Sequence, residues 1–167
     1  SIRAQEVFAQ ADIIACEDTR RMGRLLKEIG VSEKKKLVSY YDAVEATKSK
    51  TLVDQIVSEN LSLALASDAG TPCVADPGYR LIHEAHLRNV RVSPIAGPSA
   101  LAAMISVSGL PNHRVLFVGF LPKKKQKLRK EAQTWKDLEA SVVGFESAKR
   151  IASTLEILLE LYPNARI

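Results

Sequence analysis

The sequence predicts an α/β protein, with a parallel-sheet N-terminal domain followed by a second, incomplete α/β domain. Short apolar runs of strand character alternate with segments in which apolar residues recur at helical spacing. This alternation is typical of a parallel sheet covered by helices on both faces. The segment GLPN at residues 109–112 interrupts the pattern, so we expect domains at residues 1–110 and 114–167.

The expected elements of the first domain follow from this periodicity. An amphipathic helix over residues 4–11 opens the chain, and a nearly wholly apolar helix over residues 99–107 ends the domain. Between them lie predicted strands at residues 12–16, 36–39, 61–66 and 90–95. Apolar residues at helical spacing predict helices at residues 22–29, 52–57 and 81–85.

The second domain is predicted from fewer elements. Strands are expected at residues 115–120 and 142–145, with a helix that runs through Leu138 between them and an amphipathic helix from Ile151 onward. Two strands are too few to close a core, and a parallel sheet rarely begins with a helix. We therefore expect a chain that lacks its first strand and its tail.

Positive charge is concentrated in one segment. The 167 residues carry 24 Lys and Arg against 19 acids, a net charge of +5, and residues 123–130 (KKKQKLRK) hold six of these cations and no acid. Such a segment attracts RNA phosphate or anionic lipid, although a solvated helix start explains it equally well. The candidate contacts are Lys123, Lys124, Lys125, Lys127 and Arg129.

Several classes of function are disfavoured. No apolar run approaches the length of a membrane span and the N-terminus has no signal-peptide pattern, so we expect a soluble, cytoplasmic protein without a membrane partner. Cys16 and Cys73 read as reduced thiols, and the three histidines show no ligand spacing, so no metal site is expected. Glycine-rich dinucleotide and Walker motifs are also missing.

Three loops that follow predicted strands hold the candidate site residues. Glu17 and Asp18 could take up a proton and Arg20 could bind a substrate, although helix capping is an alternative role for this loop. The loop at residues 67–72 (SDAGTP) offers an acid to a ligand's hydroxyl or amino groups, and its small residues permit close approach to the backbone. Ser99, in the third loop, is a suitable helix N-cap.

Four segments occur in the same order and at matching spacing in one known family. They are CEDTRRMGRLL, SDAGTPCVADPGYRLI, AGPSALAAMISVSGLP, and VGFLP followed by lysines. They closely resemble the tetrapyrrole-methylase-like class of S-adenosylmethionine-dependent methyltransferases, and within it the branch that methylates ribosomal RNA. The resemblance extends from about Ile2 to the last residues.

The resemblance implies two α/β domains that form homodimers and bind S-adenosyl-L-methionine in the cleft between the domains. The implied reaction is 2′-O-methylation of a cytidine in the decoding region of 16S rRNA, within the small ribosomal subunit. A base that accepts the ribose proton would assist it, and Asp18 and Glu17 are our candidates.

By position, the resemblance also implies which residues surround the cofactor. They are Ser67, Asp68, Ala69, Gly70, Thr71 and Pro72 in one loop, Ser99 and Ala100 in the next, and Phe120 and Leu121 from the second domain.

Two alternatives remain open from the sequence. One is a tetrapyrrole C-methyltransferase, a related enzyme whose substrate is a polycarboxylate. The other is a cofactor-free ribosome-binding module, because the family's opening strand, which ends in a P-x-G-N loop beside the cofactor, does not occur in this sequence.

Overall fold

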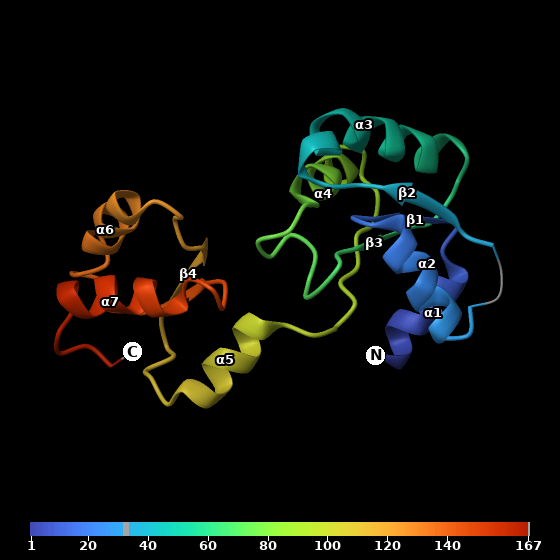
Figure 1. The fold of residues 1–167 in the computed structure, drawn as a ribbon. Coiled ribbons are helices and arrows are strands. Elements are labelled where there is room, and N and C mark those ends of the chain that lie inside the picture. The colour runs from blue at the N-terminus through green and yellow to red at the C-terminus, as the bar shows by residue number, and fades with distance from the viewer. Residues whose placement is uncertain (32–33, 167) are drawn as a thin grey trace. The chain divides into compact units, whose positions relative to one another are not determined.

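The computed structural model describes residues 1–31 and 34–166, which form two compact units, Ser1–Ala100 and Leu101–Ile167 (Figure 1). Each unit holds its own parallel sheet, so the predicted α/β class is confirmed. The domain limits at residues 110 and 114 stay a prediction.

The sheet of the first unit has three strands in the order β2-β1-β3 (Figure 1). The strands are β1 (Ile13–Cys16), β2 (Lys36–Ser39) and β3 (Leu63–Ala66), and both pairings are parallel. All four residues of β1 are buried, as expected for a central strand covered on both faces.

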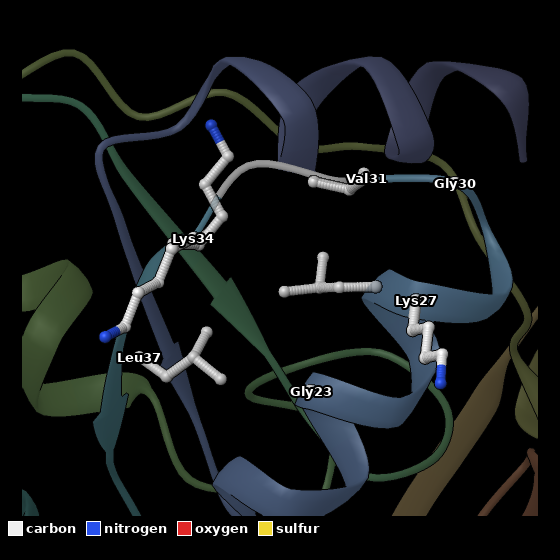
Figure 2. A pocket seen from close by; sticks show the side chains of 8 residues that line it. Gly23, Lys27, Gly30, Val31, Lys34 and Leu37 are labelled. Carbon is white, nitrogen blue, oxygen red and sulfur yellow. The ribbon is translucent and has the colours of Figure 1, made fainter.

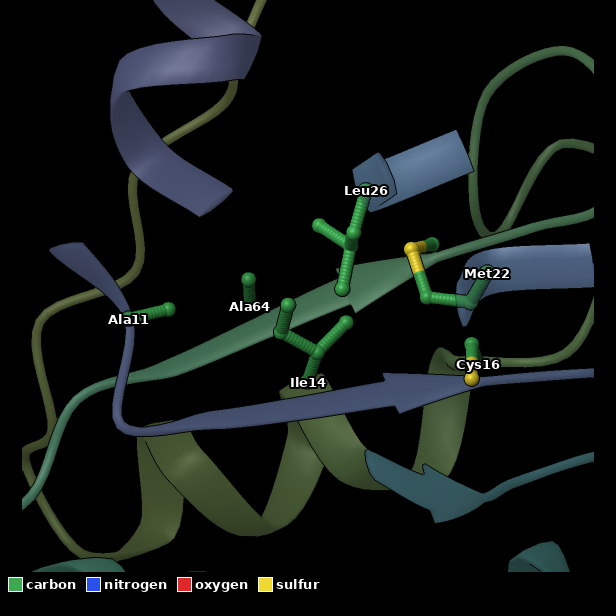
Figure 3. Packing of buried hydrophobic residues seen from close by; sticks show 6 residues of the cluster. All are labelled: Ala11, Ile14, Cys16, Met22, Leu26 and Ala64. Atoms are coloured by element: carbon green, nitrogen blue, oxygen red, sulfur yellow. The ribbon is translucent and has the colours of Figure 1, made fainter. Parts of the chain in front are cut away.

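One face of this sheet is covered by α1 (Ile2–Gln10) and α2 (Thr19–Glu28). Figure 3 shows Ile14 and Cys16 of β1 on this face. Around them pack Ala11, Met22 and Leu26, together with Ala64 of β3. Met22 and Leu26 are four residues apart, which places both on the buried side of α2.

The other face is covered by α3 (Asp42–Ser58) and α4 (Tyr79–Leu87). Leu52 and Val53 of α3 and Leu81 and Ala85 of α4 pack there against Ala15. Because successive side chains of a strand point to opposite faces, β1 contributes to both layers of the core.

The second unit contains β4 (Val115–Phe120) and β5 (Ser141–Phe145), which pair in parallel. Its helices are α6 (Lys125–Gln133) and α7 (Ile151–Leu161). A small core forms around Leu121, Leu128 and Ile157. The apolar helix α5 (Ala100–Ser108) begins at the boundary between the units.

Three predicted elements differ in the structure. Residues 90–95 are not a strand: the Val90 amide donates to the Ala85 carbonyl in the turn that ends α4, and Pro94 has no amide to contribute to a ladder. The predicted helix at residues 52–57 begins ten residues earlier, at Asp42. The helix expected to run through Leu138 ends at Gln133 and continues as turns.

No helix in the described part of the chain is both long and apolar enough to cross a membrane.

Candidate functional site

The three strands of the first unit end side by side. Cys16, the last residue of β1, pairs with Ser39 on one side and with Ala66 on the other. The loops that follow β1 and β3 therefore leave the same edge of the sheet from neighbouring positions. In open parallel sheets, ligands bind beyond this edge.

Asp68 joins the first two predicted loops. Its backbone amide donates to Glu17 Oε1 at 2.9 Å, and Arg21 Nη1 donates to its Oδ2, also at 2.9 Å. The Arg21 side chain is 70% exposed, so this ion pair between α2 and the second loop adds little to stability. Nothing in the sequence spacing of Arg21 indicated this partner.

Thr71 joins the second loop to the third. Its Oγ1 donates to the Pro98 carbonyl at 3.0 Å. The structure thus connects the loops around Glu17, Asp68 and Pro98 into one network at the sheet edge. These three residues span about 80 positions of the sequence. Ser99 and Ala100, the predicted residues of the third loop, follow Pro98 directly in the sequence.

Asp18 acts as the N-cap of α2. Its Oδ1 accepts hydrogen bonds from the amides of Arg20, at 2.8 Å, and Arg21, at 3.4 Å. The Arg20 guanidinium also donates to both of its carboxylate oxygens. The hydrogen bonds from the Arg20 side chain and amide hold the pKa of Asp18 well below its usual range, so this carboxylate is a weak proton acceptor.

Glu17 is differently placed. Only its Oε1 takes part in the bond to the Asp68 amide, and Oε2 has no partner among the described residues. The Glu17 side chain is partly buried at the end of β1. Of the two predicted catalytic acids, Glu17 therefore keeps an oxygen available.

The backbone of the second loop is open to a ligand. Ala69 and Gly70 are exposed, and their amides donate no hydrogen bond within residues 1–31 and 34–166. Gly70 has a φ of +82°, and no atom lies within 4 Å of the place where a Cβ would stand. This arrangement leaves amide donors and free space beside Asp68.

The buried side of this loop is polar. The Ser67 hydroxyl is buried, and no group in the described part of the chain lies in hydrogen-bonding geometry to it. It still influences the nearby Asp76, whose pKa is raised by burial while the Ser67 hydroxyl acts in the opposite direction. Pro72 is partly buried and follows Thr71 in the turn.

Glu45 holds the far end of the same loop, a role that sequence reasoning missed. Its Oε1 accepts from the amides of Gly78 and Arg80, both at 2.9 Å, and from the Tyr40 hydroxyl at 3.3 Å. A side chain of α3 thus satisfies the first amides of α4. Tyr40 is fully buried, and burial raises its pKa to about 12.

Phe120 and Leu121 lie at the end of β4 in the second unit. Phe120 is 65% exposed, whereas Leu121 is buried. The Leu121 amide donates to the Phe145 carbonyl and its carbonyl accepts from Arg150 Nη2, each at 3.0 Å. Leu121 lines an apolar cavity of about 650 Å³ within this unit.

The predicted basic contacts divide into two groups. Lys123, Lys124, Lys125 and Lys127 are exposed around the start of α6, and none of their side chains has a partner among the residues that the structure describes. Cations at a helix N-terminus oppose the helix dipole, so their purpose there is not helix stability. Arg129 instead forms an ion pair with Glu160 of α7.

A second cavity, of about 530 Å³, opens in the first unit beside α2 (Figure 2). Gly23 and Lys27 of α2 lie on one side, and Lys34 and Leu37 on the other. It contains none of the predicted cofactor residues. No group of three or more potential metal ligands occurs in residues 1–31 and 34–166.

Comparison with known proteins gives a consistent result. A family model described as Tetrapyrrole (Corrin/Porphyrin) Methylases matches residues 1–167. Proteins named ribosomal RNA small subunit methyltransferase I from Mesorhizobium japonicum and Vibrio cholerae are 41% and 38% identical to the chain over 96% and 98% of its length. The match spans 53% and 56% of these relatives, about half of their length.

A protein of the same name from a Hydrogenobaculum species is 37% identical, and the match covers the whole chain and 71% of that relative. Both the family model and this relative cover the three loops joined at the sheet edge. The chain therefore belongs to the tetrapyrrole methylase family.

Proposed function

We propose that the chain is part of an S-adenosyl-L-methionine-dependent methyltransferase whose substrate is 16S rRNA in the small ribosomal subunit. The reaction is 2′-O-methylation of a cytidine in the decoding region, carried out by a homodimer. The observation that carries the proposal is the network in which Glu17, Asp68 and Thr71 join three loops at one sheet edge. The names of the curated relatives support the choice of substrate.

The second loop fits the cofactor. The amides of Ala69 and Gly70 are available donors, and the carboxylate of Asp68 keeps one oxygen, Oδ1, without a partner in the described part of the chain. These groups would hold the cofactor's polar groups, with Thr71, Ser99 and Ala100 bordering them. The bound cofactor supplies a methyl group already activated by its sulfonium.

The chain's own residues must then position the ribose and accept its proton. Orientation alone accounts for much of the rate enhancement in transfers of this kind. We assign the proton acceptor to Glu17, whose Oε2 is available, and assign Asp18 to positioning, because it holds the first turn of α2 and Arg20. The exposed lysines from Lys123 to Lys127 contact RNA phosphate.

The first experiment is transfer of labelled methyl from S-adenosyl-L-methionine to purified small ribosomal subunits. The 167-residue chain is tested beside a version extended with the segments that the Mesorhizobium japonicum relative has beyond the match. We expect label in the ribose of 16S rRNA with the extended version. If that version binds the cofactor but labels no rRNA, the proposal is wrong.

A tetrapyrrole C-methyltransferase is the second candidate, and the description of the matching family favours it. The same assay with a porphyrinogen in place of the ribosomal subunit separates the two. Label in the tetrapyrrole and none in rRNA would establish this alternative.

A further inference from the structure

A second group of cations lies on the first unit. Residues 19–36 contain seven Lys or Arg and two acids. On α2, Arg20, Arg24 and Lys27 follow at intervals of four and three residues, which places them on one side of the helix. Lys34 and Lys36 follow in the segment that leads into β2, and all five residues are exposed.

Most of these cations are unpaired. The side chains of Arg24, Lys27, Lys34 and Lys36 form no hydrogen bond or ion pair with any residue that the structure describes. By contrast, Arg88 on the opposite face of the sheet is neutralised by Asp54 and Glu84. Four cations without an acidic partner in the described part of the chain thus lie close together in the sequence on the α2 side.

The arrangement is continuous with the candidate site. Arg20 pairs with Asp18, beside the loop network, and α2 extends from there for about 15 Å. At its far end, Lys27 and Lys34 stand on opposite sides of the 530 Å³ cavity (Figure 2). The cations thus run from the sheet edge to a basic-rimmed hollow.

The chemistry favours RNA over a lipid surface. A membrane-binding helix exposes an apolar face beside its basic one. In α2 Met22 and Leu26 are buried against the sheet, so that apart from Leu25, which is 39% exposed, the outer side of the helix is mainly charged. Arginine in particular matches the geometry of phosphate oxygens.

We propose that Arg20, Arg24, Lys27, Lys34 and Lys36, here called the α2 basic surface, bind the phosphate backbone of the RNA whose target nucleotide reaches the sheet edge. The inference rests on the proposed function for the identity of the RNA. It assigns the first unit an RNA contact of its own, separate from Lys123–Lys127.

The test measures RNA binding rather than methylation. The extended protein is titrated with labelled small subunits at about 50 to 200 mM salt, a range in which phosphate contacts dominate the salt dependence. The variant is Arg24→Gln/Lys27→Gln/Lys34→Gln. The matched control, Lys50→Gln/Arg80→Gln/Arg91→Gln, removes the same charge from exposed cations elsewhere in the first unit. Cofactor binding and thermal melting verify that both variants are folded.

We expect the α2 variant to bind small subunits about tenfold more weakly. The magnitude of its slope of log K against log salt should be smaller by about 2, while the control variant changes little in both quantities. Equal losses of RNA affinity in the α2 variant and the control, or no loss in either, would overturn the inference. So would an effect on binding to phosphatidylserine vesicles without one on RNA. If the unsubstituted protein binds subunits but transfers no methyl group, the proposed function fails while the surface is still judged by these slopes.

Discussion

Glu17 and Asp18 are neighbours of the same chemical type, yet the structure gives them different partners. We predict that Glu17→Gln lowers turnover about 10²- to 10⁴-fold with little change in cofactor affinity, because an amide oxygen still accepts from the Asp68 amide but no longer takes up a proton. Methyl-transfer rates across a range of pH check this. Asp18→Asn is the matched control, since Asn also caps helices. Full turnover in Glu17→Gln would exclude Glu17 as the proton acceptor.

The stability role of Asp18 is a separate prediction. Because its pKa is lowered in the folded chain, the ionised form stabilises the fold above the unfolded-state pKa, near 3.8, and this contribution is lost as pH falls through the folded-state pKa. Asp18→Asn keeps the cap and loses the ion pair, whereas Asp18→Ala loses both. At neutral pH we expect the melting temperature to be highest for the unsubstituted chain, lower for Asp18→Asn and lowest for Asp18→Ala. Indistinguishable melting of all three proteins would contradict the capping role.

A buried ion pair in the second unit gives the third prediction. The Glu146 side chain is only 4% exposed and accepts from Arg150, Thr154 and the Ser147 amide. Burial acts to raise the pKa of Glu146, but these hydrogen bonds outweigh it and lower the pKa. Arg150→Met leaves the carboxylate unpaired and should cost about 3 kcal/mol in urea unfolding.

The control for this pair is Glu146→Gln/Arg150→Met, which removes the unpaired charge and should recover part of the loss. Since the pKa of Glu146 is lowered, the pair's contribution in the unsubstituted chain is present above the unfolded-state pKa and disappears on acidification. A double variant as unstable as Arg150→Met would show that the buried charge is not the cause.

At the scale of elements, the loop between β3 and α4 contains two glycines with contrasting surroundings. A Cβ on Gly78 would stand 2.6 Å from Cys73 Sγ and 2.7 Å from Leu65 Cδ2, at a φ of +141°. We predict that Gly78→Ala costs about 3 kcal/mol in urea unfolding, from overpacking and backbone strain together. Gly70→Ala meets no atom and should cost about 1–2 kcal/mol, from its positive φ alone.

The two glycine variants also distinguish an effect on folding from an effect on ligand binding. Gly70→Ala should weaken S-adenosyl-L-methionine binding in calorimetric titration more than its small stability loss explains, because it fills the open space beside Asp68. Unchanged cofactor affinity in this variant would argue against a ligand close to this backbone.

Sequence periodicity predicted the elements whose signal is apolar. Strand β1 is a buried run, and β2 and β4 begin and end where predicted. The first half of α3 was missed because it packs through polar contacts: Ser49 bonds with the Tyr40 hydroxyl, and Lys48 donates to the Ser39 carbonyl. Such contacts leave no hydrophobic period to detect.

The candidate site shows the same division. The loop of Ser99 was predicted to follow a strand at residues 90–95, which the structure does not form. Strand-end position did identify the loops of Glu17 and Asp68 from the sequence, because parallel strands end at one edge. It could not indicate that Arg21 reaches Asp68 or that Glu45 holds the Gly78 amide, since these pairs lie 47 and 33 residues apart. Only the folded register brings them together.

At the scale of the whole molecule, the distribution of charge differs from what the sequence suggested. The run at residues 123–130 dominated the linear sequence, whereas the cations of α2 are interrupted by apolar residues. Folding buries Met22 and Leu26 and leaves Arg24 and Lys27 outside, which converts a mixed segment into a basic surface. Each unit therefore carries its own exposed cationic region.

Combining the two regions gives the last prediction. The α2 triple variant is Arg24→Gln/Lys27→Gln/Lys34→Gln, and the α6 triple variant is Lys123→Gln/Lys124→Gln/Lys125→Gln. If one RNA molecule contacts both regions, combining the two triples should reduce the magnitude of the slope of log K against log salt by about 4, the sum of separate effects of about 2 each. Subunit titrations of the two triples and their combination measure this. If the slope of the combined variant is no smaller in magnitude than the slope of either triple variant, the two regions do not hold the same RNA at the same time. Additive slopes would instead make both units part of a single binding event, in which the lysines of α6 and the α2 basic surface act on one substrate.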